Sequence, residues 1–477
     1  QTQITGDCRA LFNPEWTRRG LWDKQYSEAW RPNVPVMLLE LLSHQNLADM
    51  KFGLDPRFQF TVARSIYKGM LKFQASQEGR DFVVQPLPVD HFALRLLSDS
   101  AVQLTWQPVP DPLEPSATPE KYKVYTQIGK NGFDEGIVVN NNSVIVPLRL
   151  KNRAYSFKIT ALNAGGESFP SEILSAGIAE DAKGTVQIVN VFDRVCGPAL
   201  FDTGTMGGVE EWNDQGVPMY NNLGYVGQQY DFRRKEAWKD DDNPGWGSSY
   251  GDRENEPIPG NRFNYSTIHG NAWLSAGYSY VSTSDEVFEK TGTEALGYAI
   301  YDILAGEEKA TPGLKNPEEK EFVLYTPAFR NKLTEITAAG ANLLLSGAYV
   351  GTELTESKDT LSGKFASETL HFIHRTSHAV KNGGFTSTDY GRQWFALTGN
   401  FNTGIHPEMY TVEAPDGIEP AGKGAFTAFR YGENNVSAGV AYRGKYKVLA
   451  LGFPLETITE GQTLNSLVKQ IADFFNP

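Results

Sequence analysis

The strongest constraint on the fold is a series of apolar runs in the second half of the chain. The first, at 185–192, is apolar almost throughout, which is typical of a strand buried on both faces of a sheet. Similar runs follow at 278–282, 321–325, 341–346 and 447–452, and between them the stretches 293–304, 327–339 and 463–475 resemble helices. Strands that alternate with helices predict a mainly parallel sheet covered by helices on both sides.

The region from about 86 to 180 has a different pattern. Short segments with alternating polar and apolar residues lie at 101–106, 122–125, 143–147 and 155–161, separated by turn signals. Several such strands at a spacing of about ten residues predict a β-sandwich.

The first part, to about residue 85, contains one apolar run and one helical pattern. The run 34–42 has Pro35 near its start and Glu40 near its end, so we expect a buried strand that ends near this carboxylate. Asp55 and Pro56 then open a helix whose apolar face continues to Phe73. The expected parts are therefore 1–85, 86–180 and 181–477, and about three domains also fit the length of 477 residues.

Composition excludes several classes of protein. Hydrophobic residues are 40% and charged residues 21%, a globular balance that argues against a disordered chain. The net charge of −13 disfavours binding to nucleic acid or to anionic membranes. No run of about eighteen apolar residues predicts a transmembrane helix. Two cysteines, Cys8 and Cys196, define neither a zinc knuckle nor a disulfide scaffold.

Glu40 has two interpretations from the residues alone. A carboxylate at the carboxyl end of a strand lies where open α/β sheets place their sites. The alternative is a structural ion pair with Arg18, Arg19 or Arg31.

The segment 35–46 resembles the C-terminal half of the zinc-dependent N-acetylmuramoyl-L-alanine amidases. The resemblance implies that Glu40 is the acid/base acting on zinc-bound water. The sequences of segments 16–22 and 40–46 together also resemble those of multidomain surface proteins of anaerobic bacteria that are labelled xanthan lyases. In the amidases the zinc ligands lie upstream of this strand, but the first histidine here is His44. We therefore expect zinc only in a longer parent protein, of which this chain is the C-terminal part.

Two further resemblances cover the rest of the chain. Trp106, Tyr155 and the segment 161–168 are similar to fibronectin type III domains, which usually act as spacers. Segments 301–309, 343–349 and 451–458 look like a flavodoxin-like, glutamine-amidotransferase-like domain. Ser346 stands where such an enzyme would carry its cysteine nucleophile, so we expect a domain used for structure or binding.

Three groups of residues are weaker candidates for binding. His371, His374 and His378 would share a metal only if they lay on a helix, whereas their surroundings favour strand and loop with hydrogen-bonded histidines. The aromatic, loop-like insertion at about 205–280 contains two further sets, which could bind calcium or stack on sugar rings, or could simply bury the loop. These sets are Asp240, Asp241 and Asp242 for calcium, and Trp212, Trp238 and Trp246 for a ligand.

The sequence thus predicts a multidomain α/β plus all-β protein with an incomplete amidase-like part. We expect this chain to be the part of an exported peptidoglycan hydrolase that lacks the zinc ligands. The alternative is a non-catalytic surface protein that binds a glycan or another partner. Xanthan lyase activity is less favoured, because no segment shows the Tyr or His base with an Arg or Asn partner that lyases combine.

Overall fold

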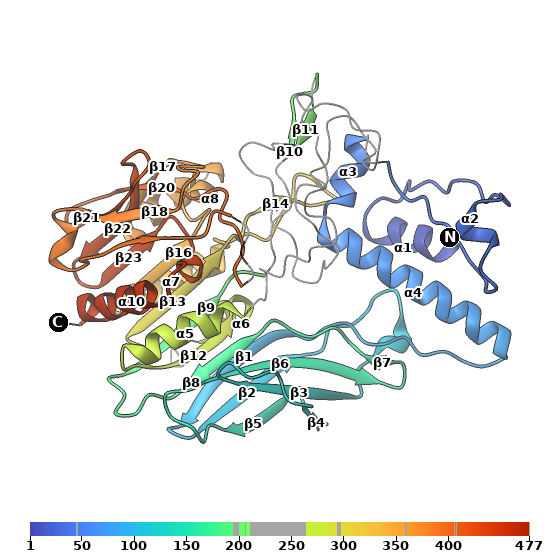
Figure 1. Ribbon diagram of the computed structural model, residues 1–477, viewed down its shortest axis with the longest axis horizontal. Helices are drawn as coiled ribbons and strands as arrows, with labels where there is room; N and C mark the ends of the chain where they lie inside the picture. Colours follow the sequence, from blue (N-terminus) through green and yellow to red (C-terminus); the bar gives the residue numbers. More distant parts are fainter. Residues whose placement is uncertain are drawn as a thin grey trace.

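The computed structural model describes residues 1–43, 46–193, 200–205, 207–209, 264–292, 297–357, 360–404, 406 and 408–476. They form an N-terminal helical part, a β-sandwich and an α/β part, with the chain ends on opposite sides of the molecule (Figure 1).

The N-terminal part is held together by two helices. Helix α1 (Thr2–Leu11) packs along α4 (Pro56–Glu78), and the shorter α2 (Ser27–Trp30) and α3 (Leu47–Gly53) lie between them in sequence. As the sequence predicts, Asp55 caps α4 by accepting the backbone N–H of Arg57 at 2.8 Å. Between the helices, the buried ammonium group of Lys68 lies 2.8 Å from the carboxylate of Asp7.

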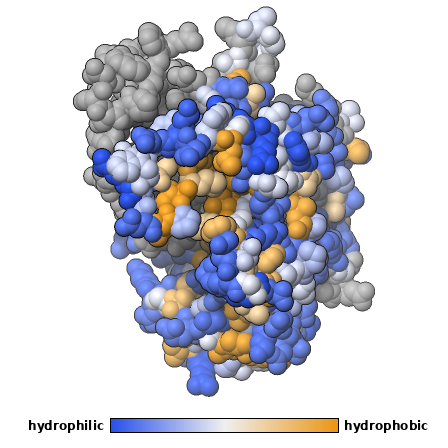
Figure 2. All heavy atoms as spheres, turned by 90° about the vertical axis from the view of Figure 1, so that its right-hand side faces the viewer, coloured by the Kyte–Doolittle hydropathy of each residue, from blue (hydrophilic) through white to orange (hydrophobic). Residues whose placement is uncertain are grey.

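The strand expected at 34–42 is absent, so this prediction was wrong. Residues 1–43 and 46–89 contain no strand, and an isolated strand has no neighbour to satisfy its backbone N–H and C=O groups. Apolar side chains of this segment are therefore exposed, among them Val34, Met37 and Leu38. Figure 2, which views this side of the molecule, shows apolar side chains at the surface. The apolar face of α4 also reaches solvent at Met70 and Phe73.

The sandwich consists of eight short strands around one core. They are β1 (Asp90–Ser98), β2 (Ala101–Gln107), β3 (Lys121–Ile128), β4 (Ile137–Val139), β5 (Ser143–Pro147), β6 (Ala154–Asn163), β7 (Gly166–Glu167) and β8 (Leu174–Gly177). Trp106 is buried in the core and its ring meets that of Tyr122 edge-on at 5.4 Å. The hydroxyl of Tyr155 accepts the backbone N–H of Leu150 at 2.9 Å, the tyrosine corner that many such sandwiches use.

The α/β part is built on five parallel strands. They are β9 (Thr185–Asn190), β12 (Ser279–Ser284), β13 (Ile300–Gly306), β16 (Asn342–Gly347) and β23 (Lys447–Leu451). Their order in the sheet is β12-β9-β13-β16-β23. The second strand along the chain is added on one side of β9 and the later ones on the other, so the strand order reverses between β9 and β13. Antiparallel strands extend the sheet beyond β23, namely β22 (Ser437–Arg443), β21 (Ala425–Tyr431), β18 (Gly384–Ser387) and β19 (Thr398–Asn400).

Helices cover both faces of this sheet, as predicted from the alternating pattern (Figure 1). On one face, α5 (Tyr265–Ser275) and α10 (Gly461–Phe475) bury their apolar side chains against the strands. On the other, α6 (Asp285–Lys290) and α7 (Pro327–Ala338) do the same. Shorter elements complete this part: β10 (Leu200–Asp202), β11 (Gly207–Val209), β14 (Thr311–Pro312), β15 (Lys320–Glu321), α8 (Thr352–Glu356), α9 (Thr360–Phe365), β17 (Phe372–Thr376) and β20 (Gly417–Pro420).

Three local predictions in this part were wrong. Residues 300–304, expected to be helical, belong to strand β13, because this apolar stretch is buried on both faces of the sheet. Of the strand expected at 321–325, only Glu321 lies in a strand, the two-residue β15 (Lys320–Glu321). Helix α5 lies inside the stretch expected to be a loop, where small polar residues such as Ser266, Thr267 and Gly270 weaken the helical pattern.

The sandwich is joined to the α/β part by a shared sheet. Strand β8 pairs with β12, and the backbone N–H of Ser175 donates to the hydroxyl of Ser282 at 2.7 Å. A Cβ at Gly177 would lie 2.6 Å from the ring of Tyr280, so the two parts meet too closely for a side chain there. The sandwich therefore packs directly against the part that follows, and its role as a spacer stays a prediction.

Candidate functional site

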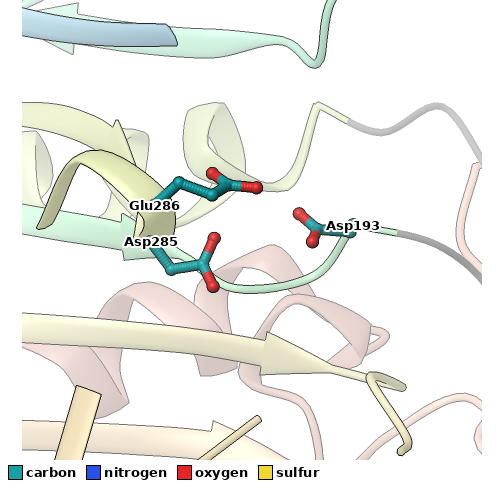
Figure 3. A group of neighbouring side chains, drawn as sticks. All are labelled: Asp193, Asp285 and Glu286. Carbon is teal, nitrogen blue, oxygen red and sulfur yellow. The ribbon is translucent and has the colours of Figure 1, made fainter. Parts of the chain in front are cut away.

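Acidic side chains gather at the carboxyl ends of three neighbouring parallel strands. Asp193 follows β9, and Asp285 and Glu286 open α6 directly after β12 (Figure 3). Glu308 follows β13. In open α/β sheets, ligands bind outside the carboxyl ends of the strands, at the point where the strand order reverses. The carboxylates thus occupy the region of the sheet in which a site is expected.

The geometry of this cluster is close enough for shared coordination. One carboxylate oxygen from each of Asp193, Asp285 and Glu286 lies within 4.8 Å of the others, and their side chains point toward one another (Figure 3). The buried Glu308 fixes the loop after β9, because its Oε2 accepts the backbone N–H of Asp193 at 3.0 Å. In addition, Oδ1 of Asp285 is buried without a hydrogen-bond partner among the described residues.

Like charges dominate the electrostatics of the cluster. Enclosure by protein, together with the carboxylates of Glu308 and Glu286, raises the pKa of Asp193 well above its usual value. Asp193 is exposed, whereas Asp285 and Glu286 are half-buried. Burial and the negative charge of Asp193 raise the pKa of Asp285 in the same way. Without a bound cation, the repulsion among these carboxylates therefore disfavours their ionised forms.

Glu172 of the sandwich extends this acidic region. Burial and the negative charge of Glu286 raise the pKa of Glu172 to about 8, against the effect of a hydrogen bond from the amide of Asn190. The acidic region thus spans the junction between the sandwich and the parallel sheet.

A hard divalent cation fits this donor set. Calcium takes carboxylate oxygens at roughly 2.3–2.6 Å, so two of its ligands cannot lie more than about 5 Å apart. The limit of 4.8 Å among the three carboxylates satisfies this condition. Asp193, Asp285 and Glu286 could hold such an ion, and its charge would offset their mutual repulsion. Among the described residues, they are the one group of three potential ligands this close together.

A second set of polar groups is buried inside the α/β part. His269 of α5 lies between two carboxylates, with Nδ1 at 2.9 Å from Asp302 and Nε2 at 3.2 Å from Glu456. Trp273 donates to Asp302 at 2.7 Å, and Tyr410 donates to Glu456 at 2.7 Å. Burial acts to lower the pKa of His269, but the two carboxylates outweigh it and raise the pKa to about 10.

This second set is structural in character. All of its ionisable side chains are at most 2% exposed, so no ligand reaches them without a rearrangement. At neutral pH His269 is an imidazolium that donates from both nitrogens and ties α5 to β13 and to the turn after β23.

Glu40 lies on the surface and forms an ion pair. Its carboxylate is 3.6 Å from Arg19, and the two side chains are 56% and 67% exposed. The alternative of an ion pair with one of the nearby arginines is confirmed, whereas the strand expected to carry Glu40 does not form.

Replacing Glu40 by alanine should therefore change the free energy of unfolding by less than about 1 kcal/mol, because exposed ion pairs contribute little. Urea unfolding of the wild type and of Glu40→Ala checks this expectation. A loss above about 2 kcal/mol would mean that Glu40 supports the fold in a way that its exposed pair does not explain.

The three histidines do not come together as a metal site. His371 stacks on the ring of Tyr442, while His374 in β17 lies 3.3 Å from the hydroxyls of Thr352 and Ser377. They form no group of three close ligands among the described residues. The expectation of strand and loop agrees with β17 and β18 from residue 372 on, but it was wrong for residues 367–370, which belong to a helical turn at 366–370.

Several other predicted residues lie outside the described residues. They are Trp212, Trp238 and Trp246, the aspartates Asp240, Asp241 and Asp242, and Cys196. Cys8 is described and buried, which raises the pKa of its thiol to about 11. Ser346 is fully buried in β16, so a ligand cannot reach its hydroxyl.

Comparisons with known proteins find likenesses to fibronectin type III domains. No family model matches the chain, and no curated protein matches it. Solved structures of fibronectin type III domains are similar to about a fifth of it. A myokine structure is 16% identical, with 20% of this chain and 100% of that chain covered and a TM-score of 0.18. The third such domain of the human KIAA0343 protein is 13% identical, with 20% and 85% covered and a TM-score of 0.18. A domain of human collagen XX is 18% identical, with 20% and 97% covered and a TM-score of 0.16.

These likenesses concern the fold alone and carry no function to this chain. None of the helices that the structure describes combines the length and apolar character needed to span a bilayer.

Proposed function

We propose that this chain is a binding protein whose α/β part holds one divalent cation, with calcium favoured, at the carboxyl edge of its parallel sheet. The observation that carries the proposal is the convergence of Asp193, Asp285 and Glu286 from two adjacent strand ends. The buried, unpartnered oxygen of Asp285 supports it, because a carboxylate oxygen in that position gains from a cation.

The ligand would be an oxygen-rich, acidic glycan of a cell surface, peptidoglycan included. Asp193 is exposed, so a bound cation would keep coordination positions open to solvent. Carboxylate and hydroxyl groups of such a glycan are suitable ligands for calcium. Export of the chain is part of this proposal, and a tandem arrangement with a fibronectin type III-like sandwich is consistent with it.

The flavodoxin-like assignment is part of the same proposal. The parallel strands lie in the order second, first, third, fourth and fifth along the chain, which is the flavodoxin-like order. The cluster follows the first, second and third of these strands, next to the reversal at which such sheets bind ligands.

Zinc-dependent amidase chemistry at Glu40 remains a prediction from the resemblance. The exposed ion pair of Glu40 gives it no geometric support. Release of muropeptides by a longer parent protein, lost on Glu40→Ala, would favour the enzyme. Binding of peptidoglycan that survives Glu40→Ala would favour the binding protein.

Thermal unfolding of the full chain with EDTA, and then with calcium, tests the cation site. At a hundred times the dissociation constant, a cation should stabilise the folded state by about 2.7 kcal/mol. We expect Asp285→Asn to be more stable than the wild type in EDTA, because one repelling charge is gone, and to gain nothing from calcium. The opposite signs in the two conditions distinguish a cation site from a merely structural carboxylate.

Asp99→Asn is the matched control, since Asp99 is an exposed aspartate of the sandwich, and it should keep the full response to calcium.

The dependence of stability on pH gives a second check. Glu172, whose pKa is raised to about 8, binds more protons in the folded state, so without a cation stability should fall as pH rises from about 4 to 8, and the raised pKa values of Asp193 and Asp285 act in the same direction. Equal stability of the wild type with EDTA, calcium and magnesium would contradict the proposal.

A further inference from the structure

A recess of about 540 Å³ opens on the antiparallel side of the sheet, away from the carboxylate cluster. It lies over the paired strands β18 and β21 and the turn that follows β18, and its lining includes Thr386, Asp389, Tyr390, Phe426, Arg430 and Asn435. This volume falls within the range of small-molecule sites, roughly 300–1,000 Å³. Its lining combines aromatic rings with hydroxyl, amide and charged side chains.

The aromatic wall of the recess is held in place yet exposed. Tyr390 is 55% exposed, although its ring meets Phe426 at 5.0 Å and Trp394 at 5.4 Å, both nearly edge-on. Trp394 in turn lies under the guanidinium group of Arg443 at 5.1 Å. A large ring that neighbours immobilise and solvent still reaches offers a flat apolar surface at little entropic cost.

Polar side chains surround this ring and offer both donors and acceptors. Thr386 and Arg430 are directly opposite each other on β18 and β21, so their side chains leave the sheet on the same face. Arg430 is oriented by donating to the backbone carbonyl of Asn435 at 2.8 Å. Asp389 is fully exposed at the rim, with Arg392 3.7 Å away. Hydroxyl groups of a ligand, which both donate and accept, match such a mixture.

The charges of the lining select against strongly charged ligands. Asp389 and Arg430 carry one charge of each sign, so the recess has neither the basic excess that phosphate needs nor the acidic excess of the carboxylate cluster. A ligand with an apolar face and a rim of neutral hydroxyls fits both the ring and its surroundings. We propose that this recess binds a neutral pyranose ring of a glycan, with Tyr390 as the stacking platform.

This site is separate from the cation site. Four strands, β13, β16, β23 and β22, lie between β9 and β21 in the sheet, so the two regions share no residue. Binding in the recess should therefore be insensitive to EDTA, and its failure would leave the cation proposal untouched.

Isothermal titration of the full chain with chitotriose and with cellotriose, in EDTA, tests the proposal. We expect one of these neutral oligosaccharides to bind, Tyr390→Ala to weaken binding at least tenfold, and Tyr390→Phe to retain most of it. Phe169→Ala, which removes an exposed aromatic ring of the sandwich, is the matched control and should bind as the wild type does. The absence of binding by both sugars, or unchanged binding by Tyr390→Ala with circular dichroism like the wild type, would overturn the proposal.

Discussion

Replacing His269 by leucine should destabilise the α/β part by about 3–5 kcal/mol, the cost of leaving buried charges without their partner. The imidazolium of His269 lies between the buried carboxylates of Asp302 and Glu456, at 2.9 and 3.2 Å. Leucine has a similar size, so the loss arises from the two carboxylates and not from a cavity. Urea unfolding followed by tryptophan fluorescence should show a lower midpoint.

A triple variant makes this prediction specific to charge. His269→Leu combined with Asp302→Asn and Glu456→Gln should recover part of the lost stability, because no buried carboxylate then remains unpaired. The raised pKa of His269 also predicts a dependence on pH. Its contribution is fully present below the unfolded pKa of about 6.5, and it is lost as pH rises through the folded pKa of about 10. An equal loss of stability in His269→Leu and in the triple variant would contradict this explanation.

Replacing Asp416 by alanine should cost about 2–4 kcal/mol, because it leaves buried backbone donors unsatisfied. Oδ2 of this fully buried carboxylate accepts the N–H groups of Gly351 and Thr352, at 2.6 and 2.7 Å, where α8 begins. The hydroxyl of Thr352 donates to the other oxygen of this carboxylate, Oδ1. Hydrogen exchange of the amides of Gly351 and Thr352 should accelerate strongly in Asp416→Ala.

Asp416→Asn is the matched control for this prediction. The amide oxygen of asparagine can still accept one or both N–H groups, so its loss of stability should be smaller than that of alanine. Exchange that is equally slow in the wild type and in Asp416→Ala would show that the N-terminus of α8 does not depend on this side chain.

The main features of the fold could be predicted from local patterns. Runs buried on both faces identified β9, β16 and β23, and Asp55 with Pro56 identified the start of α4. The strand predicted at 34–42 was wrong, because an apolar pattern indicates that a segment favours burial but does not show that a partner strand is present. Helix α5 was missed because its small polar residues face the sandwich, where Ser266 and Thr267 form buried hydrogen bonds to Ser175 and Ser156.

The polar clusters were harder to predict, because their members are distant in sequence. His269 is 33 residues from Asp302 and 187 from Glu456, so no motif joins them. A signal for part of the carboxylate cluster did exist, because Asp193 comes immediately after the apolar-rich run 185–192, whereas Asp285 follows a strand rich in serine and threonine. Their convergence follows only once the strand order is known, since β9 and β12 must be neighbours in the sheet.

The most direct test of the cation site is a crystal of the full chain soaked in manganese, measured for anomalous scattering. Manganese accepts the same carboxylate ligands as calcium and magnesium. The account predicts an anomalous peak within about 2.5 Å of carboxylate oxygens of Asp193, Asp285 and Glu286, absent from Asp285→Asn crystals. A well-ordered cluster with no peak, or a peak that persists in Asp285→Asn, would contradict it.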